Sequence, residues 1–387
     1  MHQAQTSLFP LMLEIERAEG VYLFDVKGKQ YLDLISGISV SSLGHGNEHV
    51  KNAIKQQLDK YMHLMVYGEF IQSPQVKLAK KLTDLLPPNL NSVYLVNSGS
   101  EATDGALKLA KRVTGRTEII ACNNAYHGSG HAALSLNSNE YFKNAFRPLL
   151  PDINFIEFNN ENSLQKISHK TACVIVETIQ GEAGYLPPQN DFLKKLRAKC
   201  DEHSVLFILD EIQTGMGRTG NLFAFEDYGI VPDILLLGKA LGAGMPIGAF
   251  VSSQTMMNEF ADNPVLGHIT TFGGHPVIAT AALAGIEELL SNNWIKEVNE
   301  KENLFRKLLV HPAIKNISGK GLMLALEFES FEFNKKIIDA CIEDGLITDW
   351  FLYAPNCLRI APPLIITEDQ IRWSCEVLIK NLKKFTA

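Results

Sequence analysis

Two stretches of the chain, VLFILDEIQTGMGRTG (205–220) and DILLLGKALGAG (233–244), indicate how it folds and where its chemistry lies. Each contains a short apolar run, VLFIL or ILLL, with the character of a buried strand. Each run leads to one charged residue, Asp210 in the first stretch and Lys239 in the second. A charged group at the end of a buried strand is costly unless something compensates it. Two such groups so close in sequence indicate a ligand that contacts both.

Pyridoxal phosphate is a ligand of this kind. A lysine amine can bind its aldehyde as an imine, and a carboxylate can pair with its protonated ring nitrogen. Burial would lower the pKa of Lys239 and make its amine a nucleophile toward carbonyl groups. Glycines at positions 238, 242 and 244 would let the backbone approach a flat ring closely.

Length and composition limit the class of protein. At 387 residues the chain is long for one core, which favours two domains or one domain with a lobe. The net charge of −7 provides no basic footprint for nucleic acid and no polybasic patch for a membrane. The six cysteines form no CxxC pair, and no apolar run approaches eighteen residues. With no secretory signal apparent, we expect a cytoplasmic protein that binds neither nucleic acid nor membrane.

Short apolar runs alternate with helical patterns through the middle of the chain. The runs are Val93–Val96, Glu118–Cys122, Cys173–Val176, Val205–Leu209, Ile234–Leu237 and Ile247–Val251. Helical spacing occupies intervals such as Ala102–Val113 and Phe192–Cys200. This alternation predicts an α/β fold with a mostly parallel central sheet and helices on its faces.

Polar residues suited to one site follow five successive runs, and ligands of such sheets bind beyond the carboxyl ends of the strands. These residues are Asn97–Ser100, Tyr126–Gly128, Glu177 with Gln180–Glu182, Asp210 with Gln213, and Lys239. Packing alone does not explain so regular a recurrence, so we expect these side chains to share one site.

The remaining patterns predict three parts of the chain. Residues 1–50 form an N-terminal segment that contributes to the small lobe and to dimer contacts. Residues 51–292 form the large cofactor-binding domain and end in an Ala-rich helix. Residues 293–387 alternate strands and helices on a smaller scale and form a C-terminal α+β lobe.

The sequence Ser98-Gly99-Ser100-Glu101 precedes a helical pattern and has two compatible interpretations. It matches a capping box, with Ser98 as the cap and Glu101 at the third helical position. It also suits a phosphate site, because the free N–H groups at a helix start favour an anion.

Two other motifs match patterns of different enzyme classes. Residues 215–220 match GxGxxG but open no apolar-faced helix, so they are not typical of a dinucleotide site. His45, Glu48 and His49 match the HxxEH pattern of zinc peptidases. Gly44 and Gly46 interrupt the helix that would aim both histidines at a metal, so we expect no metal site and keep a zinc peptidase as a remote alternative. Neither a Walker A motif nor GxSxG is present.

Taken together, the motifs LDEIQTGMGRTG, LLGKALGAGMPIGAF, NSGSEA, TFGGHP and LRIAPPL occur in an order that resembles the class III (acetylornithine/ornithine-type) aminotransferases. The resemblance covers the chain from about Leu23 to Ile366. It implies the fold-type I architecture of pyridoxal phosphate-dependent transferases and a homodimer.

The resemblance also implies roles around the cofactor. Lys239 would be the Schiff-base lysine and proton shuttle, and Asp210 would keep the pyridine nitrogen protonated. The remaining cofactor-binding positions would be Ser98, Gly99 and Ser100 at the phosphate, Tyr126 on the ring, Gln213 at the ring hydroxyl, and Thr271 reaching the phosphate of the other subunit.

On the substrate side, Arg359 is similar to the arginine that binds the substrate carboxylate. Glu182 is similar to the glutamate that masks that arginine when a substrate presents a distal amine. Thr270 would line the substrate site. Ser129 stands where these enzymes usually have an arginine after His-Gly, and Arg147 is a candidate substitute.

Two further departures from the family pattern are Thr178, where Pro is favoured after Glu, and His275, where Asn is usual before Pro276. Neither removes a group that the reaction needs. The prediction is a pyridoxal phosphate-dependent aminotransferase that moves an amino group from acetylornithine, ornithine or another ω-amino acid to a 2-oxo acid such as 2-oxoglutarate. An aminomutase, a decarboxylating transaminase and a phosphate-ligand binding protein stay open as alternatives.

Overall fold

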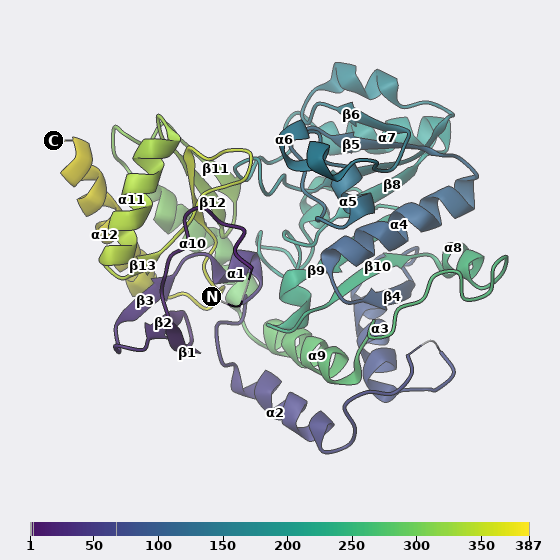
Figure 1. The fold of residues 1–387 in the computed structure, drawn as a ribbon, viewed down its shortest axis with the longest axis horizontal. Coiled ribbons are helices and arrows are strands. Elements are labelled where there is room, and N and C mark those ends of the chain that lie inside the picture. The colour runs from purple at the N-terminus through teal and green to yellow at the C-terminus, as the bar shows by residue number, and fades with distance from the viewer. Residues whose placement is uncertain (1, 3, 67, 387) are drawn as a thin grey trace.

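A central seven-stranded sheet organises the computed structural model, which describes residue 2, residues 4–66 and residues 68–386. The strand order is β4-β10-β9-β8-β7-β5-β6 (Figure 1). The strands are β4 (Ser92–Val96), β5 (Glu118–Cys122), β6 (Ile153–Ile156), β7 (Thr171–Glu177), β8 (Leu206–Asp210), β9 (Ile234–Gly238) and β10 (Gly248–Ser252). Strands β6, β5, β7, β8 and β9 pair in parallel, and β10 is antiparallel to both β9 and β4. The predicted mostly parallel sheet is therefore confirmed.

Helices cover both faces of this sheet, which explains why its strands are continuous apolar runs rather than alternating ones. Helix α4 (Gly99–Thr114) packs on one face, where Ile175 and Ile208 point toward it. On the other face, Val174 and Phe207 join the larger core with α7 (Phe192–His203). Further helices are α2 (Glu48–Leu58), α3 (Ser73–Leu85), α5 (His131–Ser135), α6 (Glu140–Lys143), α8 (Gln254–Met257) and α9 (Pro276–Ser291), and α9 packs against α2 and α3.

The C-terminal part lies beside the large sheet and joins the N-terminal strands (Figure 1). One sheet has the order β1-β2-β3-β13, so strands from both ends of the chain pair in it, and the other has the order β11-β12-β14. The strands are β1 (Ile15–Glu19), β2 (Tyr22–Asp25), β3 (Gln30–Asp33), β11 (Asn316–Lys320), β12 (Met323–Glu327), β13 (Leu346–Ile347) and β14 (Cys357–Ile360). The helices are α1 (Ser36–Ser39), α10 (Trp294–Leu308), α11 (Phe331–Glu343) and α12 (Glu368–Thr386).

The sequence patterns missed strand β1, the short helices α5, α6 and α8, and three further elements. Strand β6 has only four residues, helix α10 carries many charges, and strand β11 (NISGK) is rich in polar residues. The short β6 and the polar β11 lack the apolar periodicity that identifies an element from sequence. Helix α10 has this periodicity, at Trp294, Val298, Phe305 and Leu308, and was overlooked. The boundaries 1–50, 51–292 and 293–387 stay predictions. No helix within the described residues is long and apolar enough to cross a membrane.

Candidate active site

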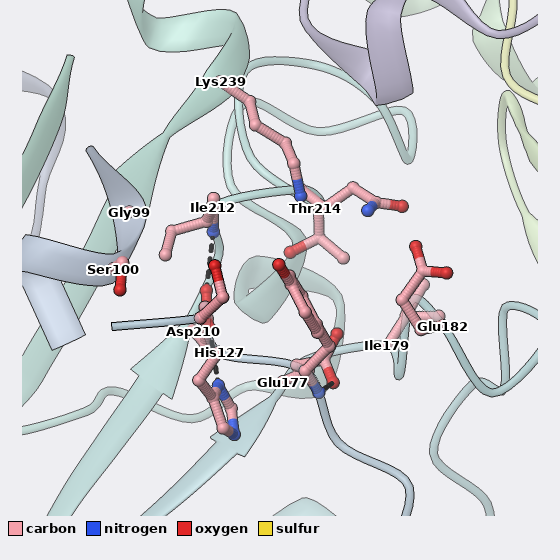
Figure 2. A pocket seen from close by; sticks show the side chains of 14 residues that line it. Gly99, Ser100, His127, Glu177, Ile179, Glu182, Asp210, Ile212, Thr214 and Lys239 are labelled. Carbon is pink, nitrogen blue, oxygen red and sulfur yellow. Dashed lines mark hydrogen bonds and ion pairs between the residues drawn. The ribbon is translucent and has the colours of Figure 1, made fainter. Parts of the chain in front are cut away.

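The carboxyl ends of β5, β7, β8 and β9 and the start of α4 enclose a cavity of about 190 Å³ (Figure 2). Its lining residues are Gly99, Ser100, Tyr126, His127, Gly128, Ser129, Glu177, Ile179, Glu182, Asp210, Ile212, Gln213, Thr214 and Lys239. The structure thus brings together residues from all five predicted strand ends. Parallel strands make this possible, because their carboxyl ends meet at one edge of the sheet.

Lys239 follows directly after β9 and reaches into the cavity (Figure 2). Its φ of +44° lies in the left-handed region, a strained conformation for a residue with a side chain and one that is concentrated at functional sites. Burial lowers the pKa of the Lys239 amine, although the charges of Glu182, Asp210 and Glu177 oppose this shift. A buried amine with a lowered pKa is available as a nucleophile.

Asp210 ends β8 and is held by two hydrogen bonds. Its Oδ2 lies 2.6 Å from Nδ1 of His127, and its Oδ1 accepts a hydrogen bond of 2.9 Å from the backbone N–H of Ile212. Burial disfavours the charged imidazole, but the hydrogen bond and the charge of Asp210 prevail and raise the pKa of His127. A carboxylate can accept about four hydrogen bonds, so Asp210 can still accept one from an N–H group of a ligand in the cavity.

Glu177 lies beside Asp210, because the two residues are register partners in the β7–β8 pair. Its carboxylate accepts hydrogen bonds from the backbone N–H groups of Tyr126 (3.0 Å) and Gly181 (2.7 Å). Burial raises the pKa of Glu177 to about 7, with the charge of Asp210 acting in the same direction. This side chain therefore fixes the loop that carries Tyr126 over the cavity.

The start of α4 has free backbone N–H groups that suit an anion. The Ser98 hydroxyl accepts a hydrogen bond from the N–H of Glu101, as the capping box predicts, while the Glu101 carboxylate accepts from Asn97 rather than from Ser98. Gly128, at φ +127°, faces this turn so closely that an added Cβ would lie 2.7 Å from Ser100. The N–H groups of Gly99 and Ser100 are free of helix partners at this position and suit a phosphate.

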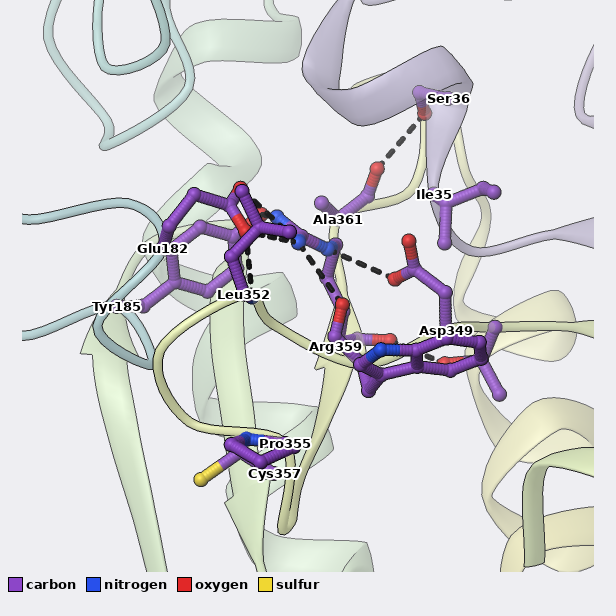
Figure 3. Close-up of polar contacts among 12 residues, drawn as sticks. Ile35, Ser36, Glu182, Tyr185, Asp349, Leu352, Pro355, Cys357, Arg359 and Ala361 are labelled. Atoms are coloured by element: carbon purple, nitrogen blue, oxygen red, sulfur yellow. Dashed lines mark hydrogen bonds and ion pairs between the residues drawn. The ribbon is translucent and has the colours of Figure 1, made fainter. Parts of the chain in front are cut away.

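The predicted substrate residues Glu182 and Arg359 are paired (Figure 3). Nη2 of Arg359 lies 3.1 Å from both carboxylate oxygens of Glu182, and Nε donates to Oδ1 of Asp349 at 2.8 Å. Charge attraction raises the pKa of Arg359 well above its usual value despite burial, and lowers that of Glu182. Asp349 comes from the segment after β13, and no sequence pattern pointed to it.

Four predicted positions lie outside the lining of the cavity. Ser98 acts as the helix cap behind it, and Arg359 reaches it only through Glu182. Thr270 accepts a hydrogen bond of 2.9 Å from Asn97, and Thr271 is exposed. Ser129 does line the cavity. The suggested substitute Arg147 does not, because its guanidinium pairs with Glu140 on the surface.

The zinc-peptidase alternative is contradicted by the placement of its histidines. His45 precedes helix α2 and lies 2.9 Å from Asp33, whereas His49 lies 3.9 Å from Glu287. Within the described residues no group of three or more His, Cys, Asp or Glu side chains could hold a metal ion.

The two other departures from the family pattern have local partners. The Thr178 hydroxyl donates a hydrogen bond of 2.8 Å to the buried Glu211, whose pKa burial raises to about 8. The imidazole of His275 stacks on His63, with 5.4 Å between ring centroids. Neither contact reaches the lining of the cavity.

Residues that the site prediction left out complete the cavity. His127 and Glu177 follow predicted strands, but the sequence assigned them no role. The structure shows that His127 hydrogen-bonds to Asp210 and that Glu177 holds the loop with Tyr126. Ile179 and Ile212 supply apolar walls. Apolar wall positions have no sequence signature, since they resemble any core residue.

The residues present fit pyridoxal phosphate. The cavity joins a buried amine, a buried carboxylate and a helix start, the three groups that the aldehyde, ring nitrogen and phosphate require. In addition, the buried Oε1 of Gln213 has no hydrogen-bond partner among the described residues, and the same is true of the Thr214 hydroxyl. Both residues line the cavity, so these polar atoms are available to hydrogen-bond a ligand there.

The chain matches the aminotransferase class-III family over residues 3–382 and belongs to that family. It is 39% identical to the acetylornithine aminotransferase of Archaeoglobus fulgidus, covering 94% of each chain. It is also 37% identical to a [LysW]-aminoadipate semialdehyde/glutamate semialdehyde transaminase of Sulfurisphaera tokodaii, covering 81% of each chain.

Solved structures show the same fold. The ornithine aminotransferase of Toxoplasma gondii, described with partial occupancy of PLP at its active site, has a TM-score of 0.92 and 28% identity, covering 99% of this chain and 92% of that one. The fold is therefore that of the fold-type I transferases, and the protein is a pyridoxal phosphate-dependent aminotransferase.

Proposed function

We propose that the protein transfers an amino group from acetylornithine, ornithine or another ω-amino acid to a 2-oxo acid such as 2-oxoglutarate. The observation that carries this proposal is that Lys239 and Asp210, at the ends of adjacent strands, line one cavity with Glu182, the partner of Arg359. Such a cavity combines a nucleophilic amine with a place for a substrate carboxylate. The acetylornithine aminotransferases among the relatives support this donor class.

The proposed cofactor contacts are those that the family resemblance implies, and they are supported by the residues that line the cavity. Asp210 binds the ring nitrogen, Gln213 the ring hydroxyl and Lys239 the aldehyde carbon. Tyr126 covers the ring, and Gly99 and Ser100 bind the phosphate from the start of α4, which Ser98 caps from behind the cavity. When bound, the cofactor supplies an electron sink for the electrons that remain when the substrate carbon loses its proton.

Lys239 is the proposed proton carrier. Because burial lowers its pKa, the amine is neutral in a larger fraction of molecules than that of an ordinary lysine. Lys239 would take the proton from the amine-bearing substrate carbon, hold it on its amine and release it again later in the transfer. The charge of Asp210, itself oriented by His127, stabilises the protonated ring nitrogen.

Arg359 and Glu182 are the proposed selectors of substrate. A bidentate guanidinium recognises a carboxylate in a geometry that lysine cannot reproduce. Glu182 would remain on Arg359 when the donor presents an amine, and would move aside for the carboxylate of the 2-oxo acid. Ser129 and Thr270 would line the remainder of the substrate site.

A donor panel tests the reaction. Purified holoenzyme is incubated with acetylornithine, ornithine and other ω-amino acids plus 2-oxoglutarate, and glutamate is measured, with Lys239→Ala as the inactive control. Glutamate formed from an ω-amino donor supports the proposal. Carbon dioxide release would indicate a decarboxylating transaminase, and isomerised donor without glutamate would indicate an aminomutase; either result contradicts it.

We also propose a homodimer in which Thr271 binds the cofactor phosphate of the other subunit. Exposed apolar side chains lie in two segments, which meet where the ring of His63 lies 4.9 Å from that of Phe272: Met62, Leu64, Met65, Phe70 and Ile71, and Val265, Leu266, Ile269 and Phe272. A second copy of the chain would remove this apolar surface from water.

Mixed dimers test the shared site. Lys239→Ala and Thr271→Ala chains are each assayed alone and then together after co-expression. If Thr271 serves the partner's site, the mixed dimer contains one site with both residues intact and regains about half of the wild-type activity per dimer. No gain on mixing, or a monomer by light scattering, contradicts the proposal.

A further inference from the structure

The guanidinium of Arg359 is bound by two carboxylates from distant segments (Figure 3). Glu182 accepts from Nη2 at 3.1 Å, and Asp349 accepts from Nε at 2.8 Å. The remaining contacts are Nη1 with the Tyr185 hydroxyl at 3.2 Å and Nη2 with the carbonyl oxygen of Trp350 at 3.2 Å. All three guanidinium nitrogens therefore have hydrogen-bond partners, and Glu182 is only one of these partners.

The two carboxylates occupy different positions relative to the cavity. Glu182 lines the cavity, whereas Asp349 is outside its lining and lies on the opposite side of the guanidinium, near Ile35 (Figure 3). A substrate in the cavity can therefore replace Glu182 directly, but it meets Asp349 only behind Arg359.

The backbone fixes Asp349 to the strand that carries Arg359. The N–H of Arg359 donates to the carbonyl oxygen of Asp349 at 2.9 Å, and the next residue, Trp350, forms a β-bridge with Leu358. The Thr348 hydroxyl donates to the carbonyl oxygen of Arg359 at 2.5 Å. Both ends of the Asp349–Arg359 ion pair thus belong to one hydrogen-bonded unit and need no rearrangement of other segments to stay together.

Burial makes the pair interdependent. The Arg359 side chain is only 2% exposed, and it lies over the Phe351 ring with 4.1 Å between its Cζ and the ring centroid. Burial raises the pKa of Asp349, while Arg359 acts to lower it and Glu182 and Asp33 act to raise it. Each group therefore depends on the other for stabilisation of its charge.

When Glu182 withdraws, three contacts of Arg359 remain: Nε with Asp349, Nη1 with Tyr185, and Nη2 with the Trp350 carbonyl. Of these, only Asp349 binds Nε, the nitrogen that joins the guanidinium to the rest of the side chain. Without it, the guanidinium could turn on its side chain and follow Glu182 rather than present Nη2 to the cavity.

We propose that Asp349 is a positioning residue that holds the guanidinium of Arg359 in place, so that Glu182 can be exchanged for a substrate carboxylate. This inference rests on the proposed role of Arg359 as the carboxylate-binding group. It extends that role by assigning the two acids different functions: Glu182 is the exchangeable partner and Asp349 the permanent one.

Binding of glutarate, a dicarboxylate that cannot react, tests the proposal without turnover. Holoenzyme is titrated with glutarate while the visible absorbance of the bound cofactor is followed. We expect Asp349→Ala and Asp349→Ser, which lack an acceptor within reach of Nε, to raise the Kd by about tenfold or more. Asp349→Asn keeps an oxygen acceptor and is expected to stay within about threefold of wild type. Asp339→Ala, which removes an exposed acid paired with Lys335, is the control.

Steady-state kinetics provide a second readout. For Asp349→Ala we expect KM for 2-oxoglutarate to rise more than kcat falls, because the binding geometry rather than the chemistry is affected. A Kd for glutarate in both Asp349→Ala and Asp349→Ser within twofold of the Asp339→Ala control would overturn the proposal. So would an Asp349→Asn variant as impaired as Asp349→Ala.

Arg359→Lys distinguishes a failure of the proposed carboxylate-binding role of Arg359 from a failure of the positioning role of Asp349. If Arg359→Lys leaves glutarate binding unchanged, the proposed role of Arg359 itself is wrong. If Arg359→Lys weakens binding at least tenfold while the Asp349 variants do not, only the positioning role of Asp349 is wrong.

Discussion

Nδ1 of His127 lies 2.6 Å from Oδ2 of Asp210, although 83 residues separate them in sequence. His127 follows β5 and Asp210 ends β8, with β7 between them in the sheet. Because the carboxylate is the acceptor, Nδ1 carries the proton, and Nε2 is buried with no partner among the described residues. The histidine thus orients the carboxylate and stabilises its charge.

Replacing His127 tests this relationship. We expect His127→Leu to lower kcat by about ten- to a hundredfold, because a hydrogen bond to a charged group contributes about 1.5–3 kcal/mol. His127→Asn, whose amide can donate to Asp210, should recover part of the loss. A Leu variant with wild-type kcat and an unchanged absorbance spectrum of the cofactor would contradict the assignment.

Lys239→Arg tests the need for a neutral amine. Arginine keeps the positive charge but stays protonated, so it can neither attack an aldehyde nor accept a proton. Activity should fall by about a thousandfold or more, and borohydride should trap no cofactor on the protein. The exposed Lys296→Arg serves as a control. A borohydride-stable adduct in the Lys239→Arg protein at another lysine would show that the attachment site is misassigned.

Gly128→Ala tests the close approach of the loop to the start of α4. The φ of +127° and the 2.7 Å separation of an added Cβ from Ser100 both oppose a side chain. We expect weaker binding of pyridoxal phosphate by about 1–3 kcal/mol, measured as Kd by absorbance titration. Gly115→Ala, at φ +65° with nothing within 4 Å of the added Cβ, also places a side chain at a positive φ but makes no such contact. Equal cofactor affinity in the two variants would show that the close contact of Gly128 with Ser100 does not shape the phosphate site.

The raised pKa of Glu177 predicts a pH dependence of stability. Its pKa is about 7 in the folded protein against an ordinary value of 4.5, so between these pH values the folded chain retains a proton that the unfolded chain has lost. Stability from this group is therefore present below about pH 4.5 and is lost as pH rises through 7, by on the order of 3 kcal/mol.

Glu177→Gln removes this titration and isolates it. We expect the Tm of the variant minus that of wild type, measured without added cofactor, to increase from pH 5 to pH 8. A difference that stays constant over this range, or that decreases, would show that Glu177 does not retain its proton on folding.

Sequence patterns located most of the sheet and most of the cavity. The strands β5, β7, β8, β9 and β10 are almost entirely buried and β4 is half-buried, so each contains a continuous apolar run that stands out from its polar surroundings. The polar residues after them could be assigned to one site, because parallel strands end at a common edge. Lys239 and Asp210 could be singled out because a charge at the end of a buried strand needs a compensating group.

Only the tertiary structure shows which side chains hydrogen-bond to Asp210 and Arg359. The contacts of His127 with Asp210 and of Asp349 with Arg359 depend on strand order and on the path of an irregular segment, and neither has a periodic signal in the sequence. Arg147 was close enough in sequence to be considered for the site, yet its guanidinium lies on the surface with Glu140. The physical reason is that apolar periodicity records which residues are buried, whereas a hydrogen bond between distant side chains depends on distances that only the packed chain defines.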